Sequence, residues 1–492
     1  MRYRRWTPVL AVGVLVIGSV VLVHSGSAAA APTAGTLRWQ PCTANTAVDC
    51  AGLTLPIDRS QPDGPTFNLA VARHPAADPA HRIGTLIYAP AGPGSSGVQS
   101  LTFTQEFNLL FPASVANDFD IVSFDPRGVG GSDPVLCDAS LINQQLSGPD
   151  PTNQAQFAAL LTGQAAVGAN CQTRTGPMFD HLDSRSQARD LDALRDALGE
   201  SSINLYALSY GTVLGQMYAE MFPRHIRTMI LDGNVDHSVN SDQAAITGAL
   251  AAQETFEAFI DWCNATTSCE LHGKNVKALV DKLFAEANSG TLPDPDNPGR
   301  TLDASGLNYD IFEPDLSAPL LTRAAHEIAV LSGLAPASPP PSGGGGGGQA
   351  PTEQPLPIYI QCADFANATT TYAKQVALLR RERAVAPDVQ MAAIKIAELC
   401  INPPFPVANP PHRLSVHGAP PILVMNSRYD TQTPYQAAQR VAAQIPGAEL
   451  VTYDGIGHGV AIRSACTETI VFNYLADQQL PPPGTHCANA LP

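Results

Sequence analysis

The chain has 492 residues and a formal net charge of −16, with 28 basic and 44 acidic side chains. This length is ample for one large hydrophobic core or for two ordinary ones. The excess of negative charge argues against nucleic acid and anionic membrane surfaces as partners, because both would repel it.

Residues 1–31 have the three parts of a secretory signal peptide. Arginines precede an apolar run at 9–23, and small residues follow as far as Ala31. The apolar run is short for a membrane span and no basic stop follows it, so we expect export rather than an uncleaved anchor. Cleavage near Ala30 or Ala31 would leave a secreted, extracellular protein with no attachment to the membrane.

The ten cysteines should be oxidised in an exported protein. Their spacing suggests bridges between neighbours in the sequence, although spacing alone leaves other connectivities open. The suggested pairs are Cys42 with Cys50, Cys137 with Cys171, Cys263 with Cys269, Cys362 with Cys400, and Cys466 with Cys487. No cysteine pair or Cys/His cluster has the spacing of a metal site, and we expect no cofactor.

The sequence from 32 to 235 is expected to form the first part of an α/β core. Strand-like runs at 52–58 and 66–72 indicate an opening antiparallel pair. Short, nearly continuous apolar runs follow and alternate with helical stretches such as 186–198; they lie at 84–88, 119–124, 203–208 and 227–231. Such runs are typical of strands covered on both faces, and they indicate a mainly parallel sheet.

A helical cap is expected between residues 236 and 414. Helix-like segments occur there at 243–262, 373–385 and 388–399, and a Pro/Gly-rich loop at 336–350 should be mobile. Sheet-like runs at 421–426 and 448–453 then resume in the last part of the chain, 415–492. The simplest interpretation is one α/β core with a helical insertion, rather than two domains in series.

A strand, a tight turn and a helix meet around Ser209. Ala207 and Gly211 flank this serine two residues away on each side, where a sharp strand-to-helix turn requires small side chains. The pattern predicts a nucleophile elbow. The alternative is an ordinary connection between a strand and a helix.

A serine nucleophile needs a base and a carboxylate that orients the base. Asp430 follows the strand-like run at 421–426, and His458 follows the next one. Ser209, Asp430 and His458 therefore occur in the chain order of an α/β-hydrolase, each in a loop after a strand. Asp232, which follows the run at 227–231, is a second candidate for the acid.

An oxyanion should be held by two backbone N–H groups. The first is that of Tyr210, directly after the nucleophile, and the second is that of Gly92 in the Gly/Pro-rich loop after the run at 84–88. In the further loop at 125–132, we expect Arg127 and Ser132 to brace the site and not to react.

Several motifs in order resemble the secreted tripeptidyl-aminopeptidase group of α/β-hydrolase serine peptidases, relatives of the prolyl aminopeptidases. They are APAGPGSSG at 89–97, DPRGVGGSDP at 125–134, ARDLDALRDALG at 188–199, SYGT at 209–212, ILDG at 230–233, DTQTP at 430–434 and GHG at 457–459, followed by Cys466 and Cys487. The resemblance covers about Leu37 to Cys487. It implies the same triad of Ser209, Asp430 and His458. Two alanines, Ala91 and Ala207, stand where this family usually has glycine.

The resemblance implies a serine exopeptidase that releases short fragments, expected to be tripeptides, from peptides with a free N-terminus. An esterase or amidase on the same scaffold and a non-catalytic cell-surface binding protein are the alternatives. If a cap closes one end of the groove, the substrate ammonium needs a carboxylate, and the candidates are Asp364, Glu254 and Glu257. The sequence gives no expectation of oligomeric state.

Overall fold

The structure is a computed structural model. It describes residues 36–489 apart from 147, 149, 296, 298, 313–317, 337–351, 366, 368 and 390–398. The expected signal peptide, nearly all of the Pro/Gly-rich loop and most of the expected helix at 388–399 lie outside the described residues. Within the described part of the chain, no helix is both long enough and apolar enough to cross a membrane.

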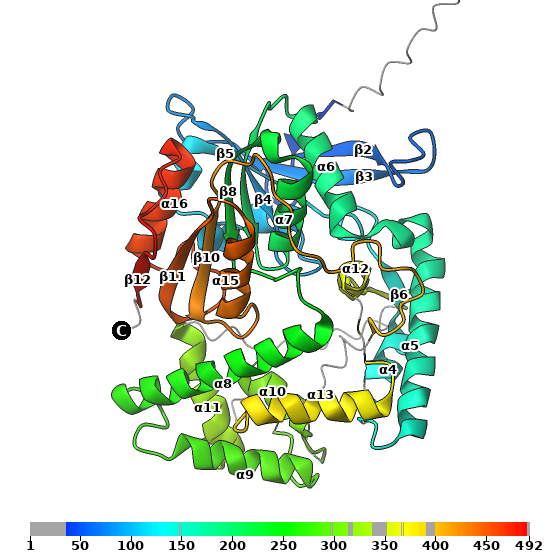
Figure 1. Ribbon diagram of the computed structural model, residues 1–492, viewed down its shortest axis with the longest axis vertical. Helices are drawn as coiled ribbons and strands as arrows, with labels where there is room; N and C mark the ends of the chain where they lie inside the picture. Colours follow the sequence, from blue (N-terminus) through cyan, green and yellow to red (C-terminus); the bar gives the residue numbers. More distant parts are fainter. Residues whose placement is uncertain are drawn as a thin grey trace, which may run out of the picture. The chain divides into compact units, whose positions relative to one another are not determined.

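In the described part of the chain, ten strands form one sheet in the order β1-β2-β3-β5-β4-β7-β8-β10-β11-β12 (Figure 1). Their bounds are Gln40–Pro41 (β1), Asp49–Pro56 (β2), Thr66–His74 (β3), Gly84–Ala89 (β4), Phe119–Phe124 (β5), Ile203–Leu208 (β7), Ile226–Asp232 (β8), Leu423–Tyr429 (β10), Glu449–Ile456 (β11) and His486–Ala488 (β12). β1, β2, β3 and β5 pair antiparallel in that order, and every later pairing is parallel. The expected opening antiparallel pair and mainly parallel sheet are confirmed. A separate antiparallel pair joins β6 (Leu136–Asp138) to β9 (Glu353–Pro355).

Helices cover both faces of the sheet because neighbouring residues of each strand point to opposite sides. On one face, Ile87 of β4 belongs to a cluster with α6, α7 and α15; on the other, Tyr88 packs with α1, α2 and α16. The helices of the core are α1 (Gly97–Thr102), α2 (Thr104–Leu110), α3 (Ala113–Asp118), α4 (Ala139–Leu146), α5 (Gln154–Thr175), α6 (Ser184–Ala197), α7 (Gly211–Met221), α15 (Tyr435–Gln444) and α16 (Ala465–Asp477), with 3₁₀ turns at Gly176–His181 and Pro223–His225. This layered arrangement is the α/β-hydrolase fold that the sequence predicted.

The chain between β8 and β10 contributes helices, and its described residues add no strand to the main sheet. These helices are α8 (Ser241–Ala265), α9 (Val276–Asn288), α10 (Ala304–Phe312), α11 (Ala318–Leu331), α12 (Ile358–Asp364) and α13 (Tyr372–Val385). Residues of α8 to α11 share a hydrophobic cluster of their own, and Tyr429 and Ile456 at the carboxyl ends of β10 and β11 pack against it. The helical cluster therefore lies at the carboxyl edge of the sheet (Figure 1). The expected boundaries at 236 and 414 fall in connections on either side of it.

Five disulfides join the pairs that the spacing suggested. They are Cys42–Cys50, Cys137–Cys171, Cys263–Cys269, Cys362–Cys400 and Cys466–Cys487, and no described cysteine is free. Each bridge is local in the sequence, with separations from 6 to 38 residues. Cys362–Cys400 closes the longest of these segments and fixes α12 to the chain that leads back into the core.

Close packing at the elbow explains its small residues. A methyl group added at Gly211 would lie 2.5 Å from the carbonyl oxygen of Ala89 and 2.7 Å from that of Pro90, so the loop after β4 excludes any side chain there. Ala207 is fully buried and faces Gly215 in the next turn of α7. A methyl group added at Gly215 would lie 3.3 Å from the Ala207 methyl. The absence of a side chain at 215 thus makes room for alanine at 207.

We predict that Gly211→Ala lowers the free energy of unfolding by about 1–3 kcal/mol, because backbone oxygens of the neighbouring loop must move. Gly248→Ala is the matched control, because it lies within α8 and an added methyl meets nothing within 4 Å. That change should leave stability unchanged or raise it by up to about 1 kcal/mol, the helix propensity difference. Denaturant unfolding measures both, and equal effects would show that the elbow is not closely packed.

We also predict unequal contributions from two disulfides of the inserted segment. Removing Cys362–Cys400 by alanine substitution should cost about 4 kcal/mol of stability and removing Cys263–Cys269 about 2 kcal/mol, because loop-closure entropy grows with the length of the closed segment. Denaturant unfolding of the two double variants tests this order. A larger loss from Cys263–Cys269 would contradict it.

Candidate active site

Ser209 lies in a strained turn between β7 and α7. Its φ of 56° is left-handed, which is uncommon for a residue other than glycine and is typical of a nucleophile elbow. The strand next to it holds the turn, because the Ser209 N–H donates to the carbonyl of Asp232 at 2.8 Å. Thr212 holds the other side, since its N–H and its hydroxyl both donate to the Ser209 carbonyl, at 2.9 and 2.6 Å.

His458 and Asp430 form a hydrogen-bonded pair, with 2.9 Å between Nδ1 and Oδ2. The Asp430 carboxylate is 1% exposed. Its other oxygen accepts the N–H groups of Gln432 and Thr433, at 2.9 and 2.8 Å. A carboxylate at Nδ1 favours the tautomer with the proton on that atom, which leaves Nε2 able to act as a base.

Thr433 is a site residue that the sequence analysis did not assign. Its hydroxyl donates to Asp430 Oδ2 at 2.8 Å and lies 3.0 Å from His458 Nδ1. The signal was present in the DTQTP motif, because a threonine three residues after an aspartate in a turn can bond both its N–H and its hydroxyl to that carboxylate. Thr433 therefore fixes the acid and limits the positions open to the imidazole.

Asp232, the second candidate acid, has a different set of partners. Its buried carboxylate accepts the N–H groups of Val460 and Ala461 and the hydroxyl of Tyr206, at distances of 2.8 to 3.1 Å. Burial raises the pKa of this carboxyl above its ordinary value. The side chain of Asp232 thus anchors the loop that follows His458, and the geometry favours Asp430 as the partner of the imidazole.

The elbow and the histidine loop are in close contact. An added methyl at Gly233 would lie 3.1 Å from His458 Cε1, and one at Gly459 would lie 2.9 Å from Leu208 Cδ1. Leu208 directly precedes the serine, and Gly233 directly follows the residue whose carbonyl binds the serine N–H. The structure therefore brings Ser209, Asp430 and His458 together at the carboxyl ends of β7, β10 and β11.

Two backbone N–H groups are available beside the serine. The Ser209 carbonyl is held by Thr212, so the N–H of Tyr210 on the same planar peptide points to the opposite side, where no described residue accepts it. The close approach of Gly211 to Ala89 and Pro90 carries the loop of Gly92 alongside. The sequence predicted that the N–H groups of Tyr210 and Gly92 hold the oxyanion, and that role stays a prediction.

The loop after β4 requires glycine at position 92. Gly92 has a φ of 129°, in the left-handed half of the torsion range, and a methyl group there would lie 2.4 Å from the N of Gly94. The role of the Gly92 N–H as the second oxyanion donor stays a prediction.

The loop after β5 braces this region, as expected. Arg127 is fully buried and makes a bidentate ion pair with Asp190, at 2.7 and 2.9 Å. Its remaining donor atom binds two backbone carbonyls. The hydroxyl of Ser132 accepts the N–H of Ala70, and Asp125 accepts the hydroxyl of Ser96 beside the oxyanion loop. The described partners of Arg127 and Ser132 are thus structural, which agrees with a bracing role.

The three carboxylates proposed for a substrate ammonium lie in very different places, and one expectation needs correction. Asp364 is 0% exposed and already accepts four hydrogen bonds, so no acceptor position is left for an ammonium. Glu257 is exposed and accepts only a bond from Gln253 on its own helix, among the described contacts. The Glu254 carboxylate lies 3.3 Å from the guanidinium of Arg428. Because Arg428 is two residues before Asp430, Glu254 lies where the inserted helices meet the candidate site.

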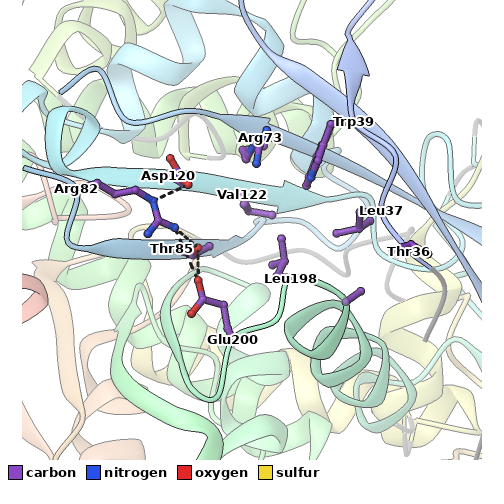
Figure 2. A pocket seen from close by; sticks show the side chains of 11 residues that line it. Thr36, Leu37, Trp39, Arg73, Arg82, Thr85, Asp120, Val122, Leu198 and Glu200 are labelled. Carbon is purple, nitrogen blue, oxygen red and sulfur yellow. Dashed lines mark hydrogen bonds and ion pairs between the residues drawn. The ribbon is translucent and has the colours of Figure 1, made fainter. Parts of the chain in front are cut away.

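Two cavities lie at opposite edges of the sheet. One of about 350 Å³ adjoins the oxyanion loop and is lined by Ser95, Ser96, Gln99, Glu106, Val129 and Pro357, among others. The other, of about 150 Å³, is shown in Figure 2, where Arg82 reaches Asp120 and Thr85 at the amino ends of β4 and β5. Parallel strands end at one edge, so only the first cavity can belong to the site around Ser209.

Comparison with known proteins agrees with this geometry. The family described as "TAP-like protein" matches residues 386–487, which include Asp430 and His458. Serine protease Hip1 of Mycobacterium tuberculosis is 31% identical over 520 residues, covering 98% of this chain and 97% of that protein. Tripeptidyl aminopeptidase of Streptomyces lividans is 28% identical, covering 91% and 86%, and carboxylesterase B of M. tuberculosis is 30% identical, covering 89% and 86%.

The match to Hip1 spans almost the full length of both proteins, and the elbow serine, the Asp–His pair and the α/β sheet are all present. The chain is a serine hydrolase that belongs to the tripeptidyl-aminopeptidase-like family of the α/β-hydrolase superfamily.

Proposed function

We propose that this protein is an exported serine exopeptidase that releases short peptides from the free N-terminus of its substrates. Its resemblance to tripeptidyl aminopeptidases suggests that the released peptides are three residues long. The observation that carries the proposal is the Asp430–His458 pair held beside a serine with left-handed backbone. The named relatives support peptidase chemistry. The five disulfides support export, because structural disulfides persist in oxidising compartments.

In the proposed reaction His458 Nε2 removes the proton of the Ser209 hydroxyl as the oxygen attacks the substrate carbonyl. The N–H groups of Tyr210 and Gly92 bind the oxyanion that forms, at the positive end of α7. His458 then gives its proton to the leaving amine, and water releases the acyl group by the same steps in reverse. Asp430 stays ionised and stabilises the imidazolium.

Cleavage from the amino end would follow from the inserted helices. They pack on the carboxyl ends of β10 and β11, so a bound chain meets a wall beside the triad. A substrate ammonium buried there needs an anionic partner. With Asp364 saturated and Glu257 in solvent, Glu254 is the remaining candidate, although it must share its carboxylate with Arg428.

An esterase or amidase is the second candidate function. A triad and an oxyanion site specify acyl transfer but not the acyl group, and one similar protein carries the name carboxylesterase B. A binding protein without catalysis is disfavoured, because the strained serine and the bonded Asp–His pair would serve no purpose there.

The first prediction concerns the nucleophile. Ser209→Ala should abolish labelling by a fluorophosphonate probe and lower turnover of peptide and ester substrates by several powers of ten, because no acyl-enzyme can form. Mass spectrometry should place the label of the unmodified protein on the peptide that contains Ser209. Labelling that persists in the variant would remove this assignment.

The two candidate acids provide a matched comparison. Asp430→Asn should reduce turnover far more than Asp232→Asn, because Asp430 bonds His458 Nδ1, whereas the described bonds of the Asp232 carboxylate go to Val460, Ala461 and Tyr206. Asp232→Asn should act mainly on stability, since it weakens the attachment of the loop after His458. The reverse order for turnover would move the acid role to Asp232.

A further prediction tests cleavage from a free amino end. N-acetylation of one peptide nitroanilide should lower kcat/KM by at least about tenfold, because it removes the positive charge that the carboxylate binds. Glu254→Gln should reduce this preference, whereas Glu257→Gln on the solvent face of the same helix should not. Equal rates for the free and acetylated substrates would favour the esterase or an endopeptidase instead.

A further inference from the structure

Tyr210 connects the reacting centre to the inserted helices. Its backbone N–H is one of the two proposed oxyanion donors, and its side chain leaves the elbow on the other side and is buried. The phenol donates a hydrogen bond of 2.6 Å to Asp364 Oδ2, and the ring lies 6.5 Å from that of Phe365. One residue therefore has its N–H in the site and its side chain anchored in the insertion.

The buried carboxylate of Asp364 is hydrogen-bonded on both of its oxygens. Oδ2 accepts two hydroxyls, those of Tyr210 and Ser184, and Oδ1 accepts two N–H groups, those of the Ser184 backbone and the Asn409 side chain. All four distances lie between 2.5 and 2.9 Å. Burial raises the pKa of Asp364 to about 6, and the four donors oppose that rise.

The position of Asp364 is itself fixed from several directions. It is the last residue of α12, and Cys362 one half-turn earlier is bridged to Cys400. The N–H of Asn409 donates to the carbonyl of Ala363, and the buried ring of His237 contacts the carbonyl of Asp364 at 3.3 Å. His237 carries no charge near neutral pH, because burial lowers its pKa to about 4. The carboxylate is thus a rigid point to which Tyr210 is attached.

We propose that Asp364 is a positioning residue for acyl transfer, which holds the Tyr210 side chain so that the Tyr210 N–H stays directed at the oxyanion. The inference rests on the proposed function, in which that N–H is an oxyanion donor. It replaces the role of ammonium anchor that the sequence suggested for Asp364. The strained backbone of Ser209 makes such an attachment useful, because the peptide plane that follows it would otherwise relax toward ordinary torsion angles.

The size of the effect follows from oxyanion chemistry. Removing one donor from an oxyanion site typically lowers kcat about 10²–10³-fold. A donor that is present but misplaced should lower kcat by a smaller factor. Tyr210→Phe deletes only the phenol oxygen, and Asp364→Ala deletes its acceptor. We expect each to lower kcat and the rate of fluorophosphonate labelling about 10- to 100-fold, while KM changes less than about threefold.

The conservative variant should restore function. In Asp364→Asn the amide oxygen can keep the two N–H donors and the amide nitrogen can face the two hydroxyls, which are able to accept as well as donate. We expect Asp364→Asn to recover at least a third of the unmodified kcat. Ser184→Ala is the matched control, because it removes a bond to the same carboxylate oxygen and leaves the hydrogen bond between Tyr210 and Asp364 in place, and it should change kcat less than threefold.

The experiment measures kcat, KM, labelling rate and thermal midpoint for the full-length protein and these variants, with one peptide nitroanilide and one short ester. The double variant of Tyr210→Phe and Asp364→Ala should have a kcat no lower than that of the slower single variant, because both changes break the same hydrogen bond. Losses that multiply would overturn the proposal, as would full activity in a folded Tyr210→Phe. If Asp364→Ala does not fold, the kcat of Tyr210→Phe compared with that of Ser184→Ala still tests the proposal.

Two other results have separate meanings. If Asp364→Asn removes the preference for free over acetylated amines, Asp364 binds the substrate and the positioning role is wrong. If Ser209→Ala retains labelling, the proposed function fails independently of every Asp364 variant. The measurements with the short ester keep the test valid if the natural substrate is not a peptide.

Discussion

The close crossing of β7 and α7 at Ser209 constrains everything around it. The turn has to reverse direction within one residue, which forces a left-handed backbone at the serine and leaves no space for a side chain at Gly211. The same crossing brings the loop after β4 against the start of α7. Ser209 and the loop of the proposed oxyanion donors therefore owe their positions to one packing requirement, and the two hydrogen bonds of Thr212 to the serine carbonyl hold the strained peptide in that state.

Buried charges surround this crossing, and each is matched by donors or by an opposite charge. Arg127 and Asp190 neutralise each other beneath the loop after β5, whereas Asp232, Asp364 and Asp430 are held mainly by N–H and hydroxyl groups. A buried carboxylate with several donors costs much less than an unpaired one and allows little movement. The three aspartates have different tasks: Asp430 orients the imidazole, Asp232 holds the loop after it, and Asp364 holds the cap to the elbow.

Much of the fold and the core of the site could be predicted from the sequence, because they leave local signals. Continuous apolar runs indicate parallel strands, and small residues around Ser209 indicate a tight turn. The order of Asp430 and His458 after later strands completed the site. Thr433 was missed because its role depends on a side chain turning back by three residues, which the motif contains but does not single out. Asp364 was misassigned because no local pattern reveals that Ser184 and Tyr210, distant in sequence, fill its acceptor positions.

The disulfides described above have a consequence for how the insertion is attached. Every bridge closes within one part of the chain, so no covalent link among them joins the insertion to the sheet. Helix α12 is nevertheless bonded to the elbow through Asp364, while α8 meets the carboxyl ends of β10 and β11 through the packing of Tyr429 and Ile456 and through the partly exposed pair of Glu254 and Arg428. The inserted segment is thus anchored at two separate places, one at the elbow and one at the carboxyl end of β10, and a mutation can remove either polar contact without removing the other.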